Sequence, residues 1–246
     1  MRLSGKRAVV TGGASGFGAG IVRRFRAEGA AVMIADLDRS GADALAAEVD
    51  AHAHATDVSV SSDMAALAEA SIAALGGIDI FVNNAGITHR PMPMETVDEA
   101  DFDRVLAVNA KSVYLSAVHI VPHMKRAGQG VVLNIASTAG VSPRPNLNWY
   151  NASKGWMITA TKAMAVELAP ARIRVNALNP VAGETPLLKS FMGEDTPEMR
   201  AKFLATIPLG RFSTPDDLGA AAAFLCSDDA SMITGVAMEI DGGRCI

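Results

Sequence analysis

Short apolar runs alternate along the chain with longer amphipathic stretches that have helical periodicity. After the first run, for example, Ile21, Val22 and Phe25 fall on one face of a predicted helix. Continuous apolar strands separated by helices are typical of a parallel sheet covered on both faces, and right-handed crossovers make such a sheet doubly wound. Its ligand site lies beyond the carboxyl ends of the strands. The runs that predict strands are residues 8–10, 31–35, 78–82, 131–136, 173–178 and 236–240.

No repeat, low-complexity tract or linker divides the 246 residues, so we expect one domain over residues 1–246. The least regular stretch, residues 180–215, holds Pro186, Pro197 and Pro208 among large apolar residues. Such a stretch is typical of a mobile flap over a pocket, here near residues 184–212. An ordinary surface loop with a helix packed on the core fits the pattern equally well, and the sequence leaves both open.

The composition narrows the class of protein. Half of the residues are apolar, and 26 acidic against 22 basic residues give a net charge of −4, which argues against a nucleic-acid partner. No apolar run approaches the roughly 20 residues that span a bilayer, and the first residues lack the apolar core of a secretory signal. Cys226 and Cys245 have the spacing of neither a disulfide framework nor a zinc site. We therefore expect a soluble cytoplasmic protein with no metal and no membrane partner.

The first run leads into a glycine-rich turn with Gly12, Gly16 and Gly18, followed by a predicted helix. These glycines permit a tight turn, and the unpaired N–H groups of the helix N-terminus attract a phosphate. A glycine-rich stretch alone is a weak signal, but its place between a strand and a helix is typical of a pyrophosphate site.

The second run ends at Asp36, 18 residues after Gly18. A carboxylate there accepts both ribose hydroxyls of an adenosine and repels a 2′-phosphate, which favours NAD over NADP. Arg39 is the counter-argument, and the alternative role for Asp36 is a helix cap, which Asp38 or Ser40 could supply instead. The neighbouring positions that could hold a phosphate-binding cation carry none: Ala14, Ser15 and Leu37.

Several polar side chains are candidates for the chemistry. Tyr150 and Lys154 are i and i+4 in a helical pattern, where an ammonium would stabilise a phenolate whose pKa is ordinarily about 10. Alone, such a pair is more often a surface pair, and Ser137 after the run 131–136 is more often a turn residue. Residues 83–86 (Asn-Asn-Ala-Gly) end another strand at the same edge, and Asn109 interrupts a long helical stretch.

Taken together, these motifs resemble the short-chain dehydrogenase/reductase family over essentially the whole chain. The resemblance implies a Rossmann-type doubly wound sheet of about seven parallel strands. The matching elements, in order, are Thr11-Gly12-x-x-x-Gly16-x-Gly18, Asp57-Val58, Asn83-Asn84-Ala85-Gly86, Asn109, Ser137, Tyr150-x-x-x-Lys154, Asn179-Pro180 and Asp241-Gly242-Gly243.

The resemblance also implies four catalytic residues. Tyr150 would be the general acid/base, and Ser137 would hydrogen-bond the substrate oxygen. Lys154 would lower the pKa of Tyr150 and bind the nicotinamide ribose. Asn109 would hold a water that connects Lys154 to solvent.

For the cofactor, the resemblance implies that Asp57 and Val58 contact the adenine and that the backbone of residues 83–86 borders the adenine ribose. After Pro180 the family usually has glycine, whereas residues 181–183 here are Val-Ala-Gly. The resemblance therefore assigns cofactor contacts to Gly183 and Thr185 in a loop whose sequence differs from the usual one. The expected cofactor contacts are Gly12, Ser15, Gly16, Phe17, Gly18, Asp36, Asp57, Val58, Asn83, Ala85, Gly86, Tyr150, Lys154, Pro180, Gly183 and Thr185.

The implied function is an NAD-dependent oxidoreductase that interconverts a secondary alcohol and a ketone by hydride transfer. Homotetramers joined through the helices near residues 98–127 and 150–168 and the C-terminal strand are implied as well. One alternative is a 3-oxoacyl-carrier-protein reductase, which Asp36 disfavours because those enzymes usually take NADPH. Others are a non-catalytic nucleotide sensor and a dehalogenase of related fold, which would carry Arg in place of Lys154.

The substrate pocket is less constrained by the sequence. His89, Arg90 and Arg144 could favour a carboxylate or polyol, although each alone is more often a solvated loop residue. We expect a polar or anionic hydroxy compound. The remaining rim candidates are Thr88, Met94, Asn146, Leu147, Trp149, Val181 and residues 186–204.

Overall fold

The computed structural model describes residues 1–246 and is built on a seven-stranded sheet. All strand pairs are parallel, in the order β3-β2-β1-β4-β5-β6-β7, so strand order reverses between β1 and β4. The strands are β1 (Arg7–Thr11), β2 (Ala31–Asp36), β3 (His52–Ala55), β4 (Ile80–Asn83), β5 (Gly130–Ile135), β6 (Ile173–Pro180) and β7 (Ala237–Ile240). This is the doubly wound Rossmann-type arrangement that the sequence predicts.

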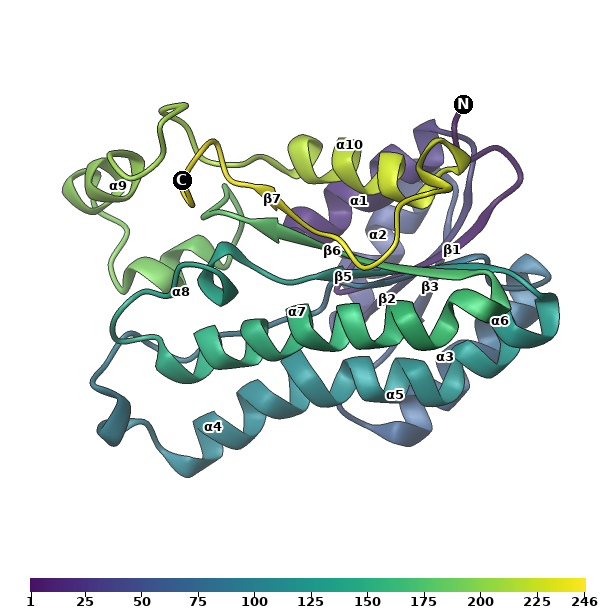
Figure 1. Cartoon of the computed structure of the whole chain (residues 1–246), viewed down its shortest axis with the longest axis horizontal. Coiled ribbons are helices and arrows are strands. Elements are labelled where there is room, and N and C mark those ends of the chain that lie inside the picture. The colour runs from purple at the N-terminus through teal and green to yellow at the C-terminus, as the bar shows by residue number, and fades with distance from the viewer.

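Helices cover both faces of the sheet (Figure 1). One face carries α1 (Gly16–Ala27), α2 (Arg39–Val49) and α10 (Pro215–Cys226). The other carries α3 (Ser61–Leu75), α4 (Glu99–Leu106), α5 (Ser112–His119), α6 (Val121–Ala127) and α7 (Asn148–Leu168).

Successive side chains of each strand point to opposite faces of the sheet, so the core is divided into two layers. In β1, Ala8 and Val10 join the cluster under α1, α2 and α10, whereas Val9 points to the cluster under α3, α5 and α7. Both faces are therefore apolar, which is why the strands read as continuous apolar runs. Phe25 and Phe81 are fully buried, one in each layer.

The predicted strands are confirmed, with small shifts in their ends, and one strand was missed. β3 has the sequence His-Ala-His-Ala at the edge of the sheet and pairs only with β2. Its residues are half-buried or exposed, so it has no apolar run to signal it.

The helical stretch Glu99–Ala127 comprises α4, a π-helical turn over Ala107–Lys111, α5 and α6. It has the length and composition of a membrane-spanning helix, with a mean hydropathy of 1.3 and 44% of the apolar window buried. The expectation that no apolar run approaches that length was therefore wrong. The stretch packs against α3, β4 and α7, as core helices do.

The segment of residues 184–212 lies beyond the carboxyl ends of the strands (Figure 1). It contains α8 (Leu188–Met192) and α9 (Pro197–Leu204). Leu188, Met192 and Ile207 form a small apolar cluster there with Val181 and Phe212, separate from the two main layers. The segment therefore has a core of its own at the edge where the ligand site is expected.

Candidate active site

A cleft of about 470 Å³ runs along the carboxyl edge of the sheet. It extends from the turns after β1 and β2, across the loop after β4, to α7 and the 184–212 segment. The glycine-rich turn, Asp36, Ser137, Tyr150 and Lys154 all line it. Residues far apart in the sequence are therefore brought to one continuous site.

Glycine is required in the turn after β1 by space as well as by backbone geometry. Gly12 and Gly16 have φ values of 60° and 53°, in the left-handed region that favours glycine. A Cβ on Gly18 would lie 2.0 Å from the carbonyl oxygen of Gly12. The amide of Asn84 donates to the carbonyls of Thr11 and Gly12 at 2.8 and 2.9 Å and holds the turn against the loop after β4.

The N-terminus of α1 opens toward the cleft. Ser15 is its N-cap residue, and its side chain makes no capping hydrogen bond. Ser15, Gly16 and Phe17 line the cleft, so N–H groups of the first turn remain available to an anion.

Asp36 is held by the backbone and does not cap the following helix. Its Oδ2 accepts from the Ala14 N–H at 2.9 Å and its Oδ1 from the Asp38 N–H at 3.0 Å. Asp38 is the N-cap residue of α2, where it accepts from Gly41 at 3.1 Å. Arg39 bonds to Asp43 at 2.7 Å and does not line the cleft, so the negative charge of Asp36 is not offset by that arginine.

Tyr150 and Lys154 lie one turn apart on α7, and both face the cleft. The Lys154 ammonium lies 5.9 Å from the centre of the Tyr150 ring and donates to the Ile135 carbonyl at 2.8 Å. The Tyr150 hydroxyl is hydrogen-bonded to Ser137, which follows β5. The Tyr150 ring also packs edge-on against Phe191 of α8, with ring centres 5.1 Å apart.

Burial dominates the titration of both α7 side chains. It raises the pKa of Tyr150 to about 12, opposed by the hydrogen bond from Ser137 and by the charge of Arg144. It lowers the pKa of Lys154 to about 8, because no carboxylate pairs with this ammonium. In the protein alone the neighbouring charge that lowers the pKa of Tyr150 is that of Arg144, and the lowering by Lys154 stays a prediction.

Asn109 lies in the π-helical turn between α4 and α5 and is fully buried. Its amide accepts from the Ile87 N–H and donates to the Ile87 carbonyl, each at 2.9 Å, and donates to Ser153 at 3.0 Å. Such turns insert one residue into a helix and often occur at functional sites. Here the turn aims Asn109 at the loop after β4 and ties that loop to α7.

Most of the predicted cofactor contacts line the cleft, but Asn83 does not. The Asn83 side-chain amide is buried and donates to Ser116 at 3.1 Å and to Asn134 at 2.8 Å, so only its backbone is left for the predicted contact with the adenine ribose. Alternation places Asn83 in the helix-covered layer and leaves Asn84 at the cleft. The predicted contacts that line the cleft are Gly12, Ser15, Gly16, Phe17, Gly18, Asp36, Asp57, Val58, Ala85, Gly86, Tyr150, Lys154, Pro180, Gly183 and Thr185.

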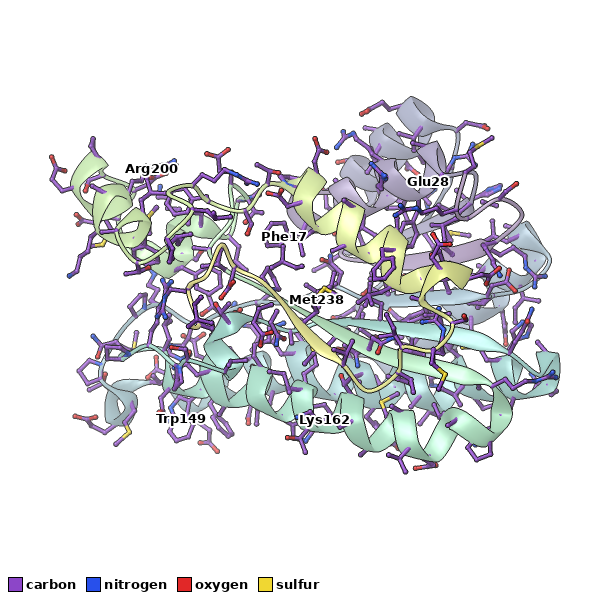
Figure 2. The ribbon with its side chains drawn as sticks, turned by 45° about the horizontal axis from the view of Figure 1, so that its top comes forward. Phe17, Glu28, Trp149, Lys162, Arg200 and Met238 are labelled. Carbon is purple, nitrogen blue, oxygen red and sulfur yellow. The ribbon has the colours of Figure 1, made fainter.

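The loop after β6 reaches back to the glycine-rich turn. A Cβ on Gly183 would lie 2.1 Å from the ring of Phe17, which stands at the start of α1 beside the 184–212 segment (Figure 2). A Cβ on Gly16 would lie 3.2 Å from Thr185. Although Val181 replaces the usual glycine after Pro180, the loop still borders the cleft.

The predicted rim residues separate into two groups. Arg144, Leu147 and Val181 line the cleft, as do Pro186, Leu187 and Phe191 of the predicted range 186–204. The other single residues do not line it, and the Trp149 indole instead donates to the Met94 carbonyl at 3.2 Å (Figure 2). The residues outside the lining are Thr88, His89, Arg90, Met94, Asn146 and Trp149.

The lining residues that were not predicted from the sequence include Thr56 and Ile87. Thr56 directly follows β3, and Ile87 lies in the loop after β4. Their positions after strands were the available signal, because strand ends meet at this edge.

A family model described as Enoyl-(Acyl carrier protein) reductase matches residues 12–244. The chain is 53% identical to 4-formylbenzenesulfonate dehydrogenase TsaC1/TsaC2 of Comamonas testosteroni, covering 100% of both chains. It belongs to the short-chain dehydrogenase/reductase family.

Two further relatives indicate the same chemistry. 2-Dehydro-3-deoxy-L-rhamnonate dehydrogenase (NAD(+)) of a Sphingomonas species is 38% identical, with 99% of this chain and 96% of the relative covered. The crystal structure of a 3-ketoacyl-(acyl-carrier-protein) reductase from Brucella melitensis, complexed with NADH, is 52% identical. It superposes with a TM-score of 0.95 over 99% of this chain and 100% of that one. The family relatives are oxidoreductases that use nicotinamide cofactors.

Proposed function

We propose that the protein is an NAD-dependent oxidoreductase that interconverts a secondary alcohol and a ketone. The observation that carries this proposal is the shared cleft. Ser137, Tyr150 and Lys154 line the same cleft as the glycine-rich turn and Asp36. A proton-transferring group beside a dinucleotide site is the arrangement that hydride-transfer chemistry needs.

The residues present fit a dinucleotide. The first turn of α1 offers N–H groups to a pyrophosphate, and the tight glycines keep side chains out of that space. In this fit the adenosine would lie beside Asp36 and the nicotinamide beside Lys154, both of which line the cleft. NAD, when bound, supplies the hydride acceptor.

The chain itself supplies proton transfer and orientation. Tyr150 takes the proton of the substrate hydroxyl in oxidation and returns it in reduction. Ser137 donates a hydrogen bond to the same substrate oxygen and steadies its negative charge. Lys154, held by the Ile135 carbonyl, places a positive charge 5.9 Å from the centre of the Tyr150 ring. Asn109 anchors the loop after β4 beneath this site.

Asp36 supports NAD over NADP. Its carboxylate lines the cleft without a paired cation, and a 2′-phosphate in its place would meet like charge. The NAD(+) in the Sphingomonas relative's name and the NADH of the Brucella complex support the same preference.

A second candidate is reduction of a 3-oxoacyl thioester on a carrier protein. The name of the Brucella reductase, at 52% identity, favours it. The unpaired carboxylate of Asp36 argues against the NADPH that such reductases usually take. Equal rates of acetoacetyl thioester reduction with NADPH and NADH would favour this second candidate.

The test is a turnover screen of hydroxy acids, polyols and cyclic alcohols with NAD and with NADP. Turnover is measured as the formation of NADH or NADPH. Tyr150→Phe should abolish turnover while NADH binding, followed by fluorescence, stays nearly intact. Tyr114→Phe is the matched control, because Tyr114 is 58% exposed on α5 and away from the cleft. Loss of turnover and NADH binding together would indicate a structural role for Tyr150. No turnover by the wild type with any alcohol would favour a nucleotide sensor.

We also infer a homotetramer that works in the cytoplasm. Tyr114 and Val118 on α5, and Trp156 and Val166 on α7, are exposed apolar side chains on the helices implied in assembly. Both cysteines are free, in keeping with a reducing compartment. Light scattering behind size-exclusion chromatography tests the assembly.

A further inference from the structure

The part of the cleft beyond Tyr150 contains a cation without a partner, Arg144. It lies in the loop between β5 and α7, is half-buried and lines the cleft. Its guanidinium stacks on Phe203 of α9, with Cζ 4.4 Å from the ring centre. No carboxylate of the chain forms an ion pair with it.

A second arginine adds to this positive charge. Arg244, in the C-terminal turn, donates to Ser142 at 3.1 Å, and its Nε is buried without a hydrogen-bond partner. Burial and the nearby Arg244 charge hold the pKa of Arg144 below its usual range. Two neighbouring guanidinium groups without a carboxylate are unfavourable in the protein alone, and an anion between the cleft wall and Arg144 would relieve that repulsion.

The distribution of charged and apolar residues in the cleft lining indicates where such an anion would bind. The only carboxylates in its lining are Asp36, the last residue of β2, and Asp57, which follows β3, both at the proposed adenosine end. The same lining also includes the apolar side chains of Leu147, Val181, Leu187 and Phe191, and Phe191 packs against Tyr150. The substrate end therefore combines apolar walls with one unpaired guanidinium, which suits an apolar body carrying one anionic group.

We propose that Arg144 binds a carboxylate or sulfonate group of the substrate, so that the enzyme acts on anionic hydroxy and carbonyl compounds. This inference rests on the proposed function and names its substrate class. The planar guanidinium donates two parallel hydrogen bonds to such a group, and stacking on Phe203 fixes its plane. Phe203 is thus a positioning residue contributed by the 184–212 segment. The rival arginine from the sequence, Arg90, is exposed and does not line the cleft.

Calorimetric binding to the NADH-saturated enzyme tests the site without turnover. The probes are two pairs of an anion and its neutral amide: benzoate with benzamide, and benzenesulfonate with benzenesulfonamide. Comparing the two anions also shows whether the site prefers a planar or a tetrahedral group. The wild type should bind at least one anion more tightly than its neutral partner, and Arg144→Met should reduce that ratio on the order of 30-fold. Arg144→Gln serves if the Met variant does not fold, and Arg90→Met is the matched control with an unchanged ratio. Equal ratios in wild type and Arg144→Met would overturn the assignment.

Turnover distinguishes this inference from the proposed function. The substrates are 3-hydroxycyclohexanecarboxylate and its carboxamide, compared as a ratio of kcat/KM. A ratio that falls about 30-fold in Arg144→Met supports both proposals. Wild-type turnover that does not discriminate between the two substrates supports the dehydrogenase and overturns the role of Arg144. Arg144-dependent anion binding without any turnover supports the site and overturns the dehydrogenase.

Discussion

Replacing Lys154 by Met should make the protein more stable near neutral pH while removing its activity. Lys154 is 4% exposed, forms no ion pair and has one hydrogen bond, to the Ile135 carbonyl. Its pKa falls from an ordinary 10.5 to about 8, which corresponds to roughly 3 kcal/mol of destabilisation below pH 8. Leaving the Ile135 carbonyl unpaired costs about 1 kcal/mol in the variant. We expect a net gain of about 1–2 kcal/mol at pH 7.

The pH dependence gives the sharper test. Between pH 8 and 10.5 the unfolded lysine still binds a proton that the folded one has lost, so wild-type stability rises with pH in that window. The advantage of Lys154→Met should therefore shrink by about 2 kcal/mol between pH 7 and 10. The raised pKa of Tyr150 acts in the opposite direction above pH 10, but Tyr150 is present in both proteins and its effect largely cancels.

Urea unfolding, followed by tryptophan fluorescence at one protein concentration without cofactor, measures the difference. Trp149 and Trp156 both lie on α7 and report on this helix. The matched control is Lys162→Met, because Lys162 is exposed on the outer face of the same helix (Figure 2). Its stability should follow that of the wild type at every pH. A Lys154→Met protein that is less stable at pH 7, or whose difference from wild type is independent of pH, would refute the reasoning.

Three further predictions concern the cleft. Because burial raises the pKa of Tyr150, kcat/KM for alcohol oxidation should rise with pH beyond pH 9. The kcat/KM for ketone reduction, which uses the protonated phenol, should be independent of pH near neutrality. A maximum of the oxidation profile below pH 8 would contradict this prediction. Asp36→Asn should lower the NAD-over-NADP ratio of kcat/KM at least about tenfold, and Asp38→Asn, at the α2 cap, should leave that ratio unchanged. Gly18→Ala should destabilise the fold by about 1–3 kcal/mol in thermal unfolding, because its Cβ meets the Gly12 carbonyl at 2.0 Å.

The sequence predicts the sheet well because burial on both faces makes its inner strands continuous apolar runs. β3 has no such run: an edge strand of alternating His and Ala is specified by its pairing with β2, a contact that periodicity does not reveal. The same applies to Asn83 and Asn84, since adjacent strand residues face opposite ways and only the register shows which one meets the cleft.

The candidate site was predictable in its membership but only partly in its electrostatics. Strand ends converge on one edge, which places Ser137 there, whereas Tyr150 and Lys154 lie on a helix and were assigned to the site by the resemblance to the family. The pKa of Tyr150 depends instead on how much protein surrounds it, and burial outweighs a charged neighbour 5.9 Å from the ring centre. Arg144 was one of three loop candidates in the sequence, with His89 and Arg90, and tertiary packing distinguishes it because it alone lines the cleft.

The separate apolar cluster of the 184–212 segment bears on how new specificities arise in such a chain. Leu188, Met192 and Ile207 pack on one another and not on the sheet layers. Substitutions there can reshape the outer wall of the cleft while the dinucleotide turn stays intact. Close contacts with the glycine-rich turn and the start of α1 constrain the beginning of this segment, where Gly183 lies against Phe17 and Thr185 lies against Gly16. Substitutions intended to change the substrate range are therefore best made after Thr185 in the sequence, so that these two contacts are kept.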